Sequence, residues 1–287
     1  MNNNNSTENP SLREIQKIEL DILIKFDEIC RNNNLTYFLD SGTALGAVRH
    51  GGFIPWDDDI DVGMPRRDYE IFMKIGQSQL GNNYFLQNRK TDPNCPFTFS
   101  KIRKNNTTFM EWNKRNIKMH HGIFIDVFPY DKLPDDSDLT NEYIKSCKKL
   151  YNRFLTRMIP DRSKMPVKGF KWFFGAVLRR LKHYIYKVFS VEKLDKEINE
   201  YFTKYNDENI YDGFSTCHCF SNKIILPNNI LYPPKEMDFE GYKFFVPYNY
   251  DLYLQKIYGD YMKLPPENER VNHQTWKIST KENLCKQ

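Results

Sequence analysis

The stretch of sequence that decides the fold is Trp56-Asp57-Asp58-Asp59-Ile60-Asp61-Val62-Gly63. Side chains of a β-strand alternate between its two faces, so a strand here would carry Asp57, Asp59 and Asp61 on one face. Ile60 and Val62 would then point into a core. Carboxylates that share one face repel one another and are costly to bury unless they are paired or bind a metal. A hard divalent cation such as Mg²⁺ takes oxygen ligands and recruits phosphate. The stretch therefore predicts a metal-dependent enzyme that acts on a phosphate ester.

A further isolated aspartate extends this pattern. Asp126 stands among apolar residues in a second strand candidate, which Gly and Pro bound on either side. If the two strands are neighbours, Asp59, Asp61 and Asp126 would gather around one cation, and we expect these three to be the catalytic and metal-binding residues. The alternative is that the first aspartates of the run only build a turn. We accept that alternative for Asp58 and leave it open for Asp57.

A glycine-containing turn upstream of the aspartates is a candidate phosphate site. Ser41-Gly42-Thr43 lies between a strand candidate and a short helix candidate. Backbone amides are exposed at such a turn, and a helix N-terminus favours phosphate. The hydroxyl groups of Ser41 and Thr43 could add hydrogen bonds to phosphate oxygens. Alone, this tripeptide is more often only a turn, and its value lies in preceding the aspartates by one short helix and a loop.

The remaining pattern indicates an α+β fold with a mixed sheet. Ser11 and Glu14 form a capping box ahead of apolar residues at helical spacing, which predicts a helix to about Arg31. The other expected elements are a helix over 43–48 and strands over 36–39, 97–103 and 122–129. The expected organisation is a disordered tail (1–10), a mixed-sheet catalytic core (11–135), a mainly helical basic segment (136–215) and a C-terminal α/β region packed on the core (216–287).

Composition narrows the class of protein. Of 287 residues, 40% are hydrophobic, which is ample for a sizeable core. The mean hydropathy is -0.70, and no stretch approaches the ~20 apolar residues that cross a bilayer. Six scattered cysteines are too sparse for a disulfide scaffold, and the N-terminus lacks the features of a secretion signal, so we expect a cytoplasmic protein. Cys217-His218-Cys219 is spaced too tightly for an ordinary zinc site and has no second pair, so zinc is not favoured.

The net charge of +5 is unevenly distributed along the chain. No acidic residue occurs from Arg162 to Val191, while Lys and Arg recur throughout. Such a field suits phosphorylated substrates, a lipid surface or nucleic acid. The aromatic and basic residues of 163–189 fit a cationic helix in peripheral contact with a membrane, and equally a helix packed onto the core with a solvated basic face. No recognised RNA-binding motif is present, so a nucleic-acid partner is not expected.

The aspartate stretch belongs to a longer run that resembles a known family. Gly42-Thr43-Ala44-Leu45-Gly46-Ala47-Val48-Arg49-His50, followed by Gly52-Phe53-Ile54-Pro55-Trp56-Asp57-Asp58-Asp59-Ile60-Asp61, looks like the LicD family. The likeness continues at 122–129 and at Tyr258-Gly259-Asp260-Tyr261-Met262. More broadly, the order of Gly42-Thr43, Asp59-Ile60-Asp61 and Asp126 is similar to the nucleotidyltransferase fold of the polymerase-beta type. The resemblance implies that Asp59, Asp61 and Asp126 bind Mg²⁺ or Mn²⁺ and that Gly42 and Thr43 contact the donor phosphate.

The resemblance also implies an activity. LicD-like proteins transfer phosphocholine or related phosphoalditols from a CDP-activated donor to cell-surface glycans. The expected protein is therefore a phosphotransferase with a CDP-linked donor, phosphocholine as the leading cargo, and a glycan or lipid-linked glycan acceptor in lipopolysaccharide, capsule or teichoic acid. One alternative is a nucleotidyltransferase that acts on a small molecule or RNA. Another is a non-catalytic scaffold in polysaccharide assembly.

Four further residues are candidates for contacts with the substrate. Arg49, Lys101 and Arg103 could neutralise the donor phosphates, because Arg forms paired hydrogen bonds to phosphate oxygens. The alternative is a solvated edge strand, above all for Lys101. Asp126 could accept the proton of the acceptor hydroxyl, and His121 is its rival, although a lone His near a strand is more often structural.

Overall fold

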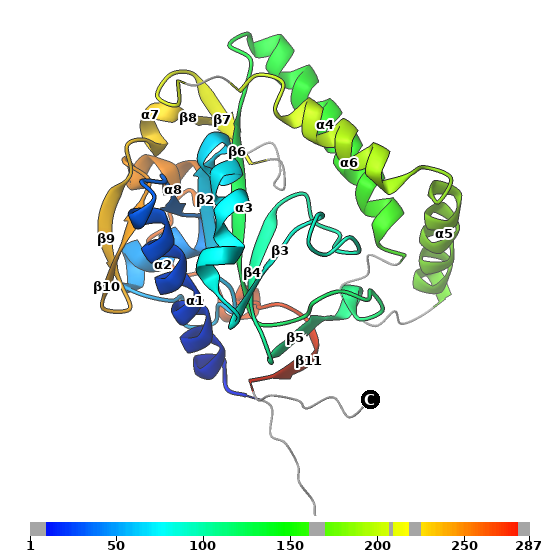
Figure 1. Cartoon of the computed structure of the whole chain (residues 1–287), viewed down its shortest axis with the longest axis horizontal. Coiled ribbons are helices and arrows are strands. Elements are labelled where there is room, and N and C mark those ends of the chain that lie inside the picture. The colour runs from blue at the N-terminus through cyan, green and yellow to red at the C-terminus, as the bar shows by residue number, and fades with distance from the viewer. Residues whose placement is uncertain (1–9, 161–169, 207–208, 218–224, 281–287) are drawn as a thin grey trace, which may run out of the picture.

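The structure is a computed structural model that describes residues 10–160, 170–206, 209–217 and 225–280 (Figure 1). The aspartate stretch leads into a mixed sheet, which confirms the α+β class. Within the described residues this sheet has seven strands, and its main path runs β1-β2-β6-β4-β3. Their bounds are β1 (Phe38–Leu39), β2 (Asp61–Pro65), β3 (Tyr84–Gln87), β4 (Ser100–Lys104) and β6 (Phe124–Lys132). At the far end of β6, β7 (Phe214–Thr216) pairs with β6, and β8 (Leu226–Pro227) pairs with β7.

The register of the sheet aligns three charged residues. β2 and β6 are parallel neighbours, and Asp61 lies opposite Asp126. β4 runs antiparallel on the other side of β6 and places Lys101 opposite the same Asp126. Residues directly opposite each other on paired strands point to the same face of a sheet. The pairing therefore puts two carboxylates and one ammonium group side by side in a single row.

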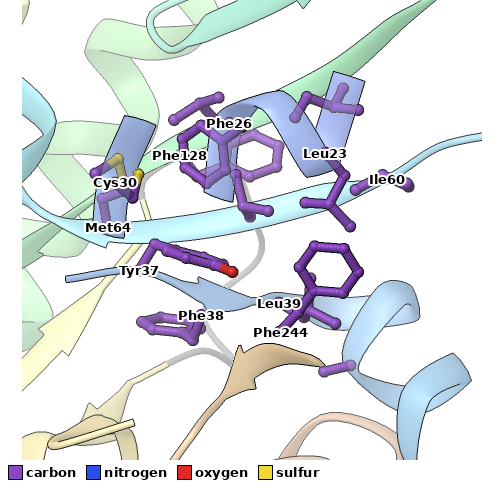
Figure 2. Close-up of a cluster of buried hydrophobic side chains, with 14 of the residues drawn as sticks. Leu23, Phe26, Cys30, Tyr37, Phe38, Leu39, Ile60, Met64, Phe128 and Phe244 are labelled. Atoms are coloured by element: carbon purple, nitrogen blue, oxygen red, sulfur yellow. The ribbon is translucent and has the colours of Figure 1, made fainter. Parts of the chain in front are cut away.

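Two amphipathic helices pack against this sheet and against each other, α1 (Leu12–Asn32) and α3 (Arg66–Leu80) (Figure 1). The predicted capping box is present at the start of α1, where the Ser11 hydroxyl accepts from the Glu14 amide and the Glu14 carboxylate accepts from the Ser11 amide. Figure 2 shows Leu23 and Phe26 of α1 in the hydrophobic core together with Ile60. Both Ile60 and Val62 are fully buried in that core, as expected.

The helix expected over 43–48 is longer and spans α2 (Ser41–His50). α2 contacts α8 (Tyr250–Tyr258) and the strand β9 (Lys235–Phe239), which forms a hairpin with β10 (Tyr242–Val246). The short helix α7 (Asn228–Leu231) packs on α8. A separate two-stranded sheet joins β5 (Thr108–Glu111) to β11 (Thr275–Ser279), and so brings the C-terminal part of the chain beside the first half. The 3₁₀ helices are η1 (Trp112–Lys114) and η2 (Glu267–Glu269).

The segment expected to be mainly helical contains α4 (Ser137–Met158), α5 (Phe170–Tyr186) and α6 (Val191–Phe202). α4 packs against both α5 and α6, and α5 lies at the periphery of the molecule (Figure 1). None of the helices in the described ranges combines the length and the apolar character needed to span a bilayer. The four cysteines in these ranges are buried, and none of them forms a disulfide bond with another described residue. The expected tail (1–9), the basic residues 163–169, and His218 and Cys219 lie outside the described residues.

One strand prediction was wrong in its extent. The strand begins only at Asp61, and the preceding aspartates lie in an irregular connection. Pro55 and Trp56 form a turn. It is closed by a hydrogen bond from the Asp57 amide to the Ile54 carbonyl oxygen. Alternation of polar and apolar residues does not distinguish a strand from an extended loop when the loop also buries every second side chain. The other strands are shifted by a few residues from the predicted ranges.

Candidate active site

A cavity of about 550 Å³ opens above the row of charged residues. Its wall combines five aspartates and a glutamate with basic, amide and aromatic side chains. The lining residues are Asp57, Asp58, Asp59, Asp61, Phe99, Lys101, Glu111, Asn113, Lys114, Asp126, Phe128, Tyr151, Val271, Asn272, His273 and Gln274. The three aspartates predicted to be catalytic therefore share one cavity.

The central ion pair of the cavity joins β4 to β6. The Lys101 ammonium group donates to Asp126 Oδ1, and both side chains are largely buried. The same ammonium group lies 3.5 Å from the centre of the Phe124 ring, a favourable position for a cation. The Asp126 carboxylate and the Phe124 ring thus hold the Lys101 ammonium group in place at the wall of the cavity.

Contacts with α1 and α2 fix the aspartate loop. The Asp61 amide donates to Thr43 Oγ1 at 2.8 Å, and the Gln16 side chain donates to the Asp57 carbonyl oxygen at 2.9 Å. Gly42 lies against the Asp57 side chain, since a Cβ there would come within 2.9 Å of Asp57 Oδ2. Ser41 is buried, and its hydroxyl donates to Asp40. None of the three residues of the predicted phosphate turn lines the cavity, and the contacts of Gly42 and Thr43 position the aspartates.

Burial and mutual repulsion raise the pKa of Asp57, Asp59 and Asp61. Burial, followed by the charge of Asp59, raises the pKa of Asp57 to about 8. Burial also raises the pKa of Asp59, although the nearby His273 opposes the shift. For Asp61, burial and the charges of Asp59 and Asp126 raise the pKa well above its ordinary value. A cation in the cavity would relieve this repulsion and displace the protons.

The sequence did not identify His273, which reaches the site from the C-terminal part of the chain. Its backbone amide donates to both carboxylate oxygens of Asp58, at 3.0 and 3.1 Å, and its Nδ1 lies 3.0 Å from Asp58 Oδ1. Burial lowers the pKa of His273, but the bond to Asp58 and the charge of Asp59 outweigh it and raise the pKa to about 9. Asp58 therefore does more than build a turn, and no local signal in the sequence could have linked it to His273.

A second ion pair, also missed by the sequence analysis, lines the same cavity. Lys114 donates to Glu111, and both side chains are mostly buried. Burial lowers the pKa of Lys114 to about 8, against the effect of Glu111. Burial raises the pKa of Glu111, but Lys114 and Lys101 outweigh it and lower the pKa to about 2. The cavity thus offers two lysines to an anionic ligand.

Three of the predicted substrate contacts lie outside the cavity. Arg103 is fully buried and donates to Gln87 Oε1 and to the Gly122 carbonyl oxygen, and burial lowers its pKa to about 10. Arg49 donates to the carbonyl oxygen of Tyr261 at 2.7 Å. The Nε2 atom of His121 lies 2.9 Å from a backbone carbonyl oxygen, that of Ile117. In the structure, these three side chains bond within the protein.

The donor set of the cavity fits a divalent cation, because it is rich in carboxylate oxygens that carry excess negative charge. One cluster of possible metal ligands is close enough to share an ion in the described part of the chain. It consists of Asp58, Asp59 and His273, whose ligand atoms all lie within 4.8 Å of one another. Asp61 and Asp126 face the same cavity beside them. Asp126 has the Lys101 ammonium group as its nearest positive charge.

Comparison with known proteins agrees with the resemblance seen in the sequence. The family model described as LicD/FKTN/FKRP, nucleotidyltransferase domain, matches residues 34–176, which include the aspartate loop and Asp126. The lipopolysaccharide cholinephosphotransferase LicD of Haemophilus influenzae is 29% identical over 277 residues, which cover 92% of this chain and 96% of that protein. The human ribitol 5-phosphate transferase FKRP is 53% identical over 32 residues, 11% of this chain and 6% of that protein. Residues 34–176 therefore form a domain of the LicD/FKTN/FKRP family, and the likeness to the Haemophilus influenzae protein extends over most of the chain.

Proposed function

We propose that the protein is a phosphotransferase that moves a phospho-substituent, with phosphocholine as the first candidate, from a CDP-linked donor to a hydroxyl group of a cell-surface glycan. The relative from Haemophilus influenzae, which matches along nearly its whole length, supports this reaction. The observation that carries the proposal is the row of Asp61, Asp126 and Lys101 across three neighbouring strands. A nucleotidyltransferase-like core would present its aspartates in this way.

We assign Asp59, Asp61 and Asp126 to a Mg²⁺ or Mn²⁺ ion. Such an ion would supply charge neutralisation for the diphosphate. Lys101 and Lys114 would bind the remaining phosphate oxygens, because both ammonium groups border the cavity and each is already fixed by a carboxylate. Preorganised charges of this kind stabilise the developing negative charge of phosphoryl transfer.

The transfer is a displacement at the phosphorus atom that carries the cargo. The acceptor oxygen forms a bond to the phosphorus that carries the cargo, and the bond from that phosphorus to the bridging oxygen breaks. CMP leaves with the electron pair. Asp126 takes the proton of the acceptor hydroxyl in this scheme, since it lies in the middle of the row and faces the cavity.

The test is a donor panel. The protein is incubated with CDP-choline, CDP-glycerol or CDP-ribitol and a glycan acceptor, with added Mg²⁺ or Mn²⁺ or with EDTA, and CMP is measured. We expect cation-dependent release of CMP, and Asp61→Asn should reduce it at least ~100-fold. Asp260→Asn, which removes an exposed aspartate, is the matched control and should retain activity. Pyrophosphate release from a nucleoside triphosphate would favour the nucleotidyltransferase alternative, and absence of any turnover would favour a scaffold.

We also propose that the acceptor is reached at a membrane surface through α5. Large apolar side chains form one stripe along this helix and the residues after it. Their exposed fractions are 54% for Phe174, 57% for Leu178, 53% for Leu181, 65% for Ile185 and 80% for Val188. The exposed side chains of Arg180, Lys182 and Lys187 flank the stripe, which gives it the charge of a surface that binds anionic lipids.

Vesicle flotation tests the membrane contact. The wild-type protein should float with phosphatidylglycerol vesicles at low salt and less at high salt. The double variant Leu181→Ser and Ile185→Ser should remain in the soluble fraction. Serine at Tyr242 and Leu252, which are also exposed but lie on β10 and α8, provides the matched control. Equal flotation of all three proteins, or a concentration-dependent dimer through α5 without lipid binding, would contradict the proposal.

A further inference from the structure

We propose that His273 and Asp59 bind a second divalent cation, in a site whose imidazole ligand makes it favour Mn²⁺ over Mg²⁺. The inference deepens the proposed function and rests on it in one respect, because the second ion would share Asp59 with the cation assigned to Asp59, Asp61 and Asp126. His273 belongs to neither the predicted ligands nor the region that the family model matches, which ends at residue 176.

The orientation of the imidazole ring is the first argument. Nδ1 lies 3.0 Å from Asp58 Oδ1, and Asp58 is itself held by two bonds from the backbone amide of His273. A carboxylate accepts, so Asp58 fixes a proton on Nδ1, and Nε2 is the ring nitrogen from which a cation can displace a proton and take the lone pair. A carboxylate that fixes the far nitrogen in this way is the usual companion of a histidine that binds a metal.

The gap between Nε2 and Asp59 is the second argument. Nε2 lies 3.9 Å from Asp59 Oδ2, which is too far for a hydrogen bond. Two ligands that each lie about 2.1 Å from one cation are about 3–4 Å apart, depending on the angle between them. The observed separation falls within that range. Asp58, Asp59 and His273 are also the groups whose ligand atoms converge within 4.8 Å in the described residues.

A buried carboxyl group that feels the charge of these aspartates supports the two geometric arguments. The Glu19 side chain is fully buried, and neither of its carboxylate oxygens has a hydrogen-bond partner among the described residues. Burial raises the pKa of Glu19 well above its ordinary value, and the charges of Asp59 and Asp58 add to this shift. Lys101 already neutralises Asp126. A cation on the Asp59 side of the cavity would favour the ionised form of Asp59, with which Lys101 forms no ion pair.

The ligand type determines which ion is favoured. Mg²⁺ prefers an all-oxygen environment, whereas imidazole nitrogen suits later divalent metals. Mn²⁺ accepts both kinds of ligand and is paramagnetic, which makes it a suitable probe. The rival role for His273 is an imidazolium ion that binds a phosphate oxygen directly, and it would place no nitrogen on a metal.

The experiment is Mn²⁺ binding to the full chain without nucleotide. Titration followed by electron paramagnetic resonance should give two ions per wild-type chain, and pulsed measurements should detect coupling to an imidazole nitrogen. His273→Gln should bind one ion and lose the nitrogen coupling, while Mg²⁺ binding changes less. Asp58→Asn should weaken the second ion by ~10–100-fold. His50→Gln, an exposed histidine outside the cavity, is the matched control and should behave as wild type.

The outcomes separate the two proposals. A single Mn²⁺ ion in the wild-type chain, or two ions without nitrogen coupling, would overturn the inference and leave the first cation in place. The nitrogen coupling is measured on the wild-type protein, so the test does not depend on whether a variant folds. Two ions with nitrogen coupling but no CMP release from any donor would instead contradict the proposed function and support the inference.

Discussion

Replacing Asp57 by Asn should flatten the dependence of stability on pH in the absence of metal. The folded protein raises the pKa of Asp57 from 3.8 to about 8 and so binds its proton more tightly than the unfolded chain does. The stability that this proton contributes is complete below pH 3.8 and is lost as the pH rises through about 8. One unit of pKa difference corresponds to about 1.4 kcal/mol. Between pH 6 and 8, the contribution of Asp57 to the free energy of unfolding should therefore fall by at most about 2 kcal/mol, because solvent screens this partly exposed group.

The assay is unfolding by urea in EDTA at pH 6 and pH 8, at constant ionic strength. The wild-type protein should lose more stability between these values than Asp57→Asn, by the amount given above. Some dependence should remain in the variant, because His273 also has a raised pKa, about 9, and its contribution is lost as the pH rises through that value. Mg²⁺ added at pH 8 should restore stability, since a cation replaces the displaced protons.

Asp260→Asn is the control for a change of one charge at an exposed position. It should follow the wild-type pH dependence. If Asp57→Asn also follows the wild-type pH dependence, the folded protein does not raise the pKa of Asp57. The explanation of the aspartate cluster as a site whose carboxylates repel one another until a cation binds would then be wrong.

Three further predictions concern the framework and the row of charges. Arg66 donates two hydrogen bonds to the fully buried Asp131. Arg66→Met should therefore lower the free energy of unfolding by ~3–5 kcal/mol, measured by urea unfolding. The double variant with Asp131→Leu should recover most of this loss, because it leaves no unpaired buried charge. A Cβ on Gly46 would lie 2.5 Å from the Gly52 carbonyl oxygen, so Gly46→Ala should cost ~1–3 kcal/mol in the same assay. Lys101→Met keeps the aliphatic chain but removes the charge that pairs with the buried Asp126, so it should also lower the free energy of unfolding. Single-turnover measurements of CMP release on the folded variant should show a loss of ~100-fold or more, and unchanged turnover would exclude Lys101 from the reaction.

Local patterns predicted much of the fold correctly. The capping box of Ser11 and Glu14 and the apolar spacing that follows specify α1, because helix signals act within a few residues. The isolated position of Asp126 among apolar residues predicted a strand, and the register of β2 and β6 brings it directly opposite Asp61. The sequence made this juxtaposition conditional on the two strands being neighbours, and the pairing satisfies the condition.

Long-range pairing explains what local patterns could not predict. The loop ahead of Asp61 is extended without being a strand, and it is held by Thr43 and by Gln16 from two helices. Lys101 and Arg103 lie two residues apart on β4 and so point to the same face of the sheet. Register alone decides that the first faces Asp126 while the second lies opposite Phe124 and bonds within the protein.

The pairing of Asp58 with His273 joins residues that are 215 positions apart. During synthesis Asp58 is made 215 residues before the imidazole that pairs with it. Until His273 has been added, a growing chain holds these carboxylates beside a cavity whose wall is unfinished. A ribosome-bound fragment that stops before His273 should accordingly lack this part of the wall, however well its sheet has formed.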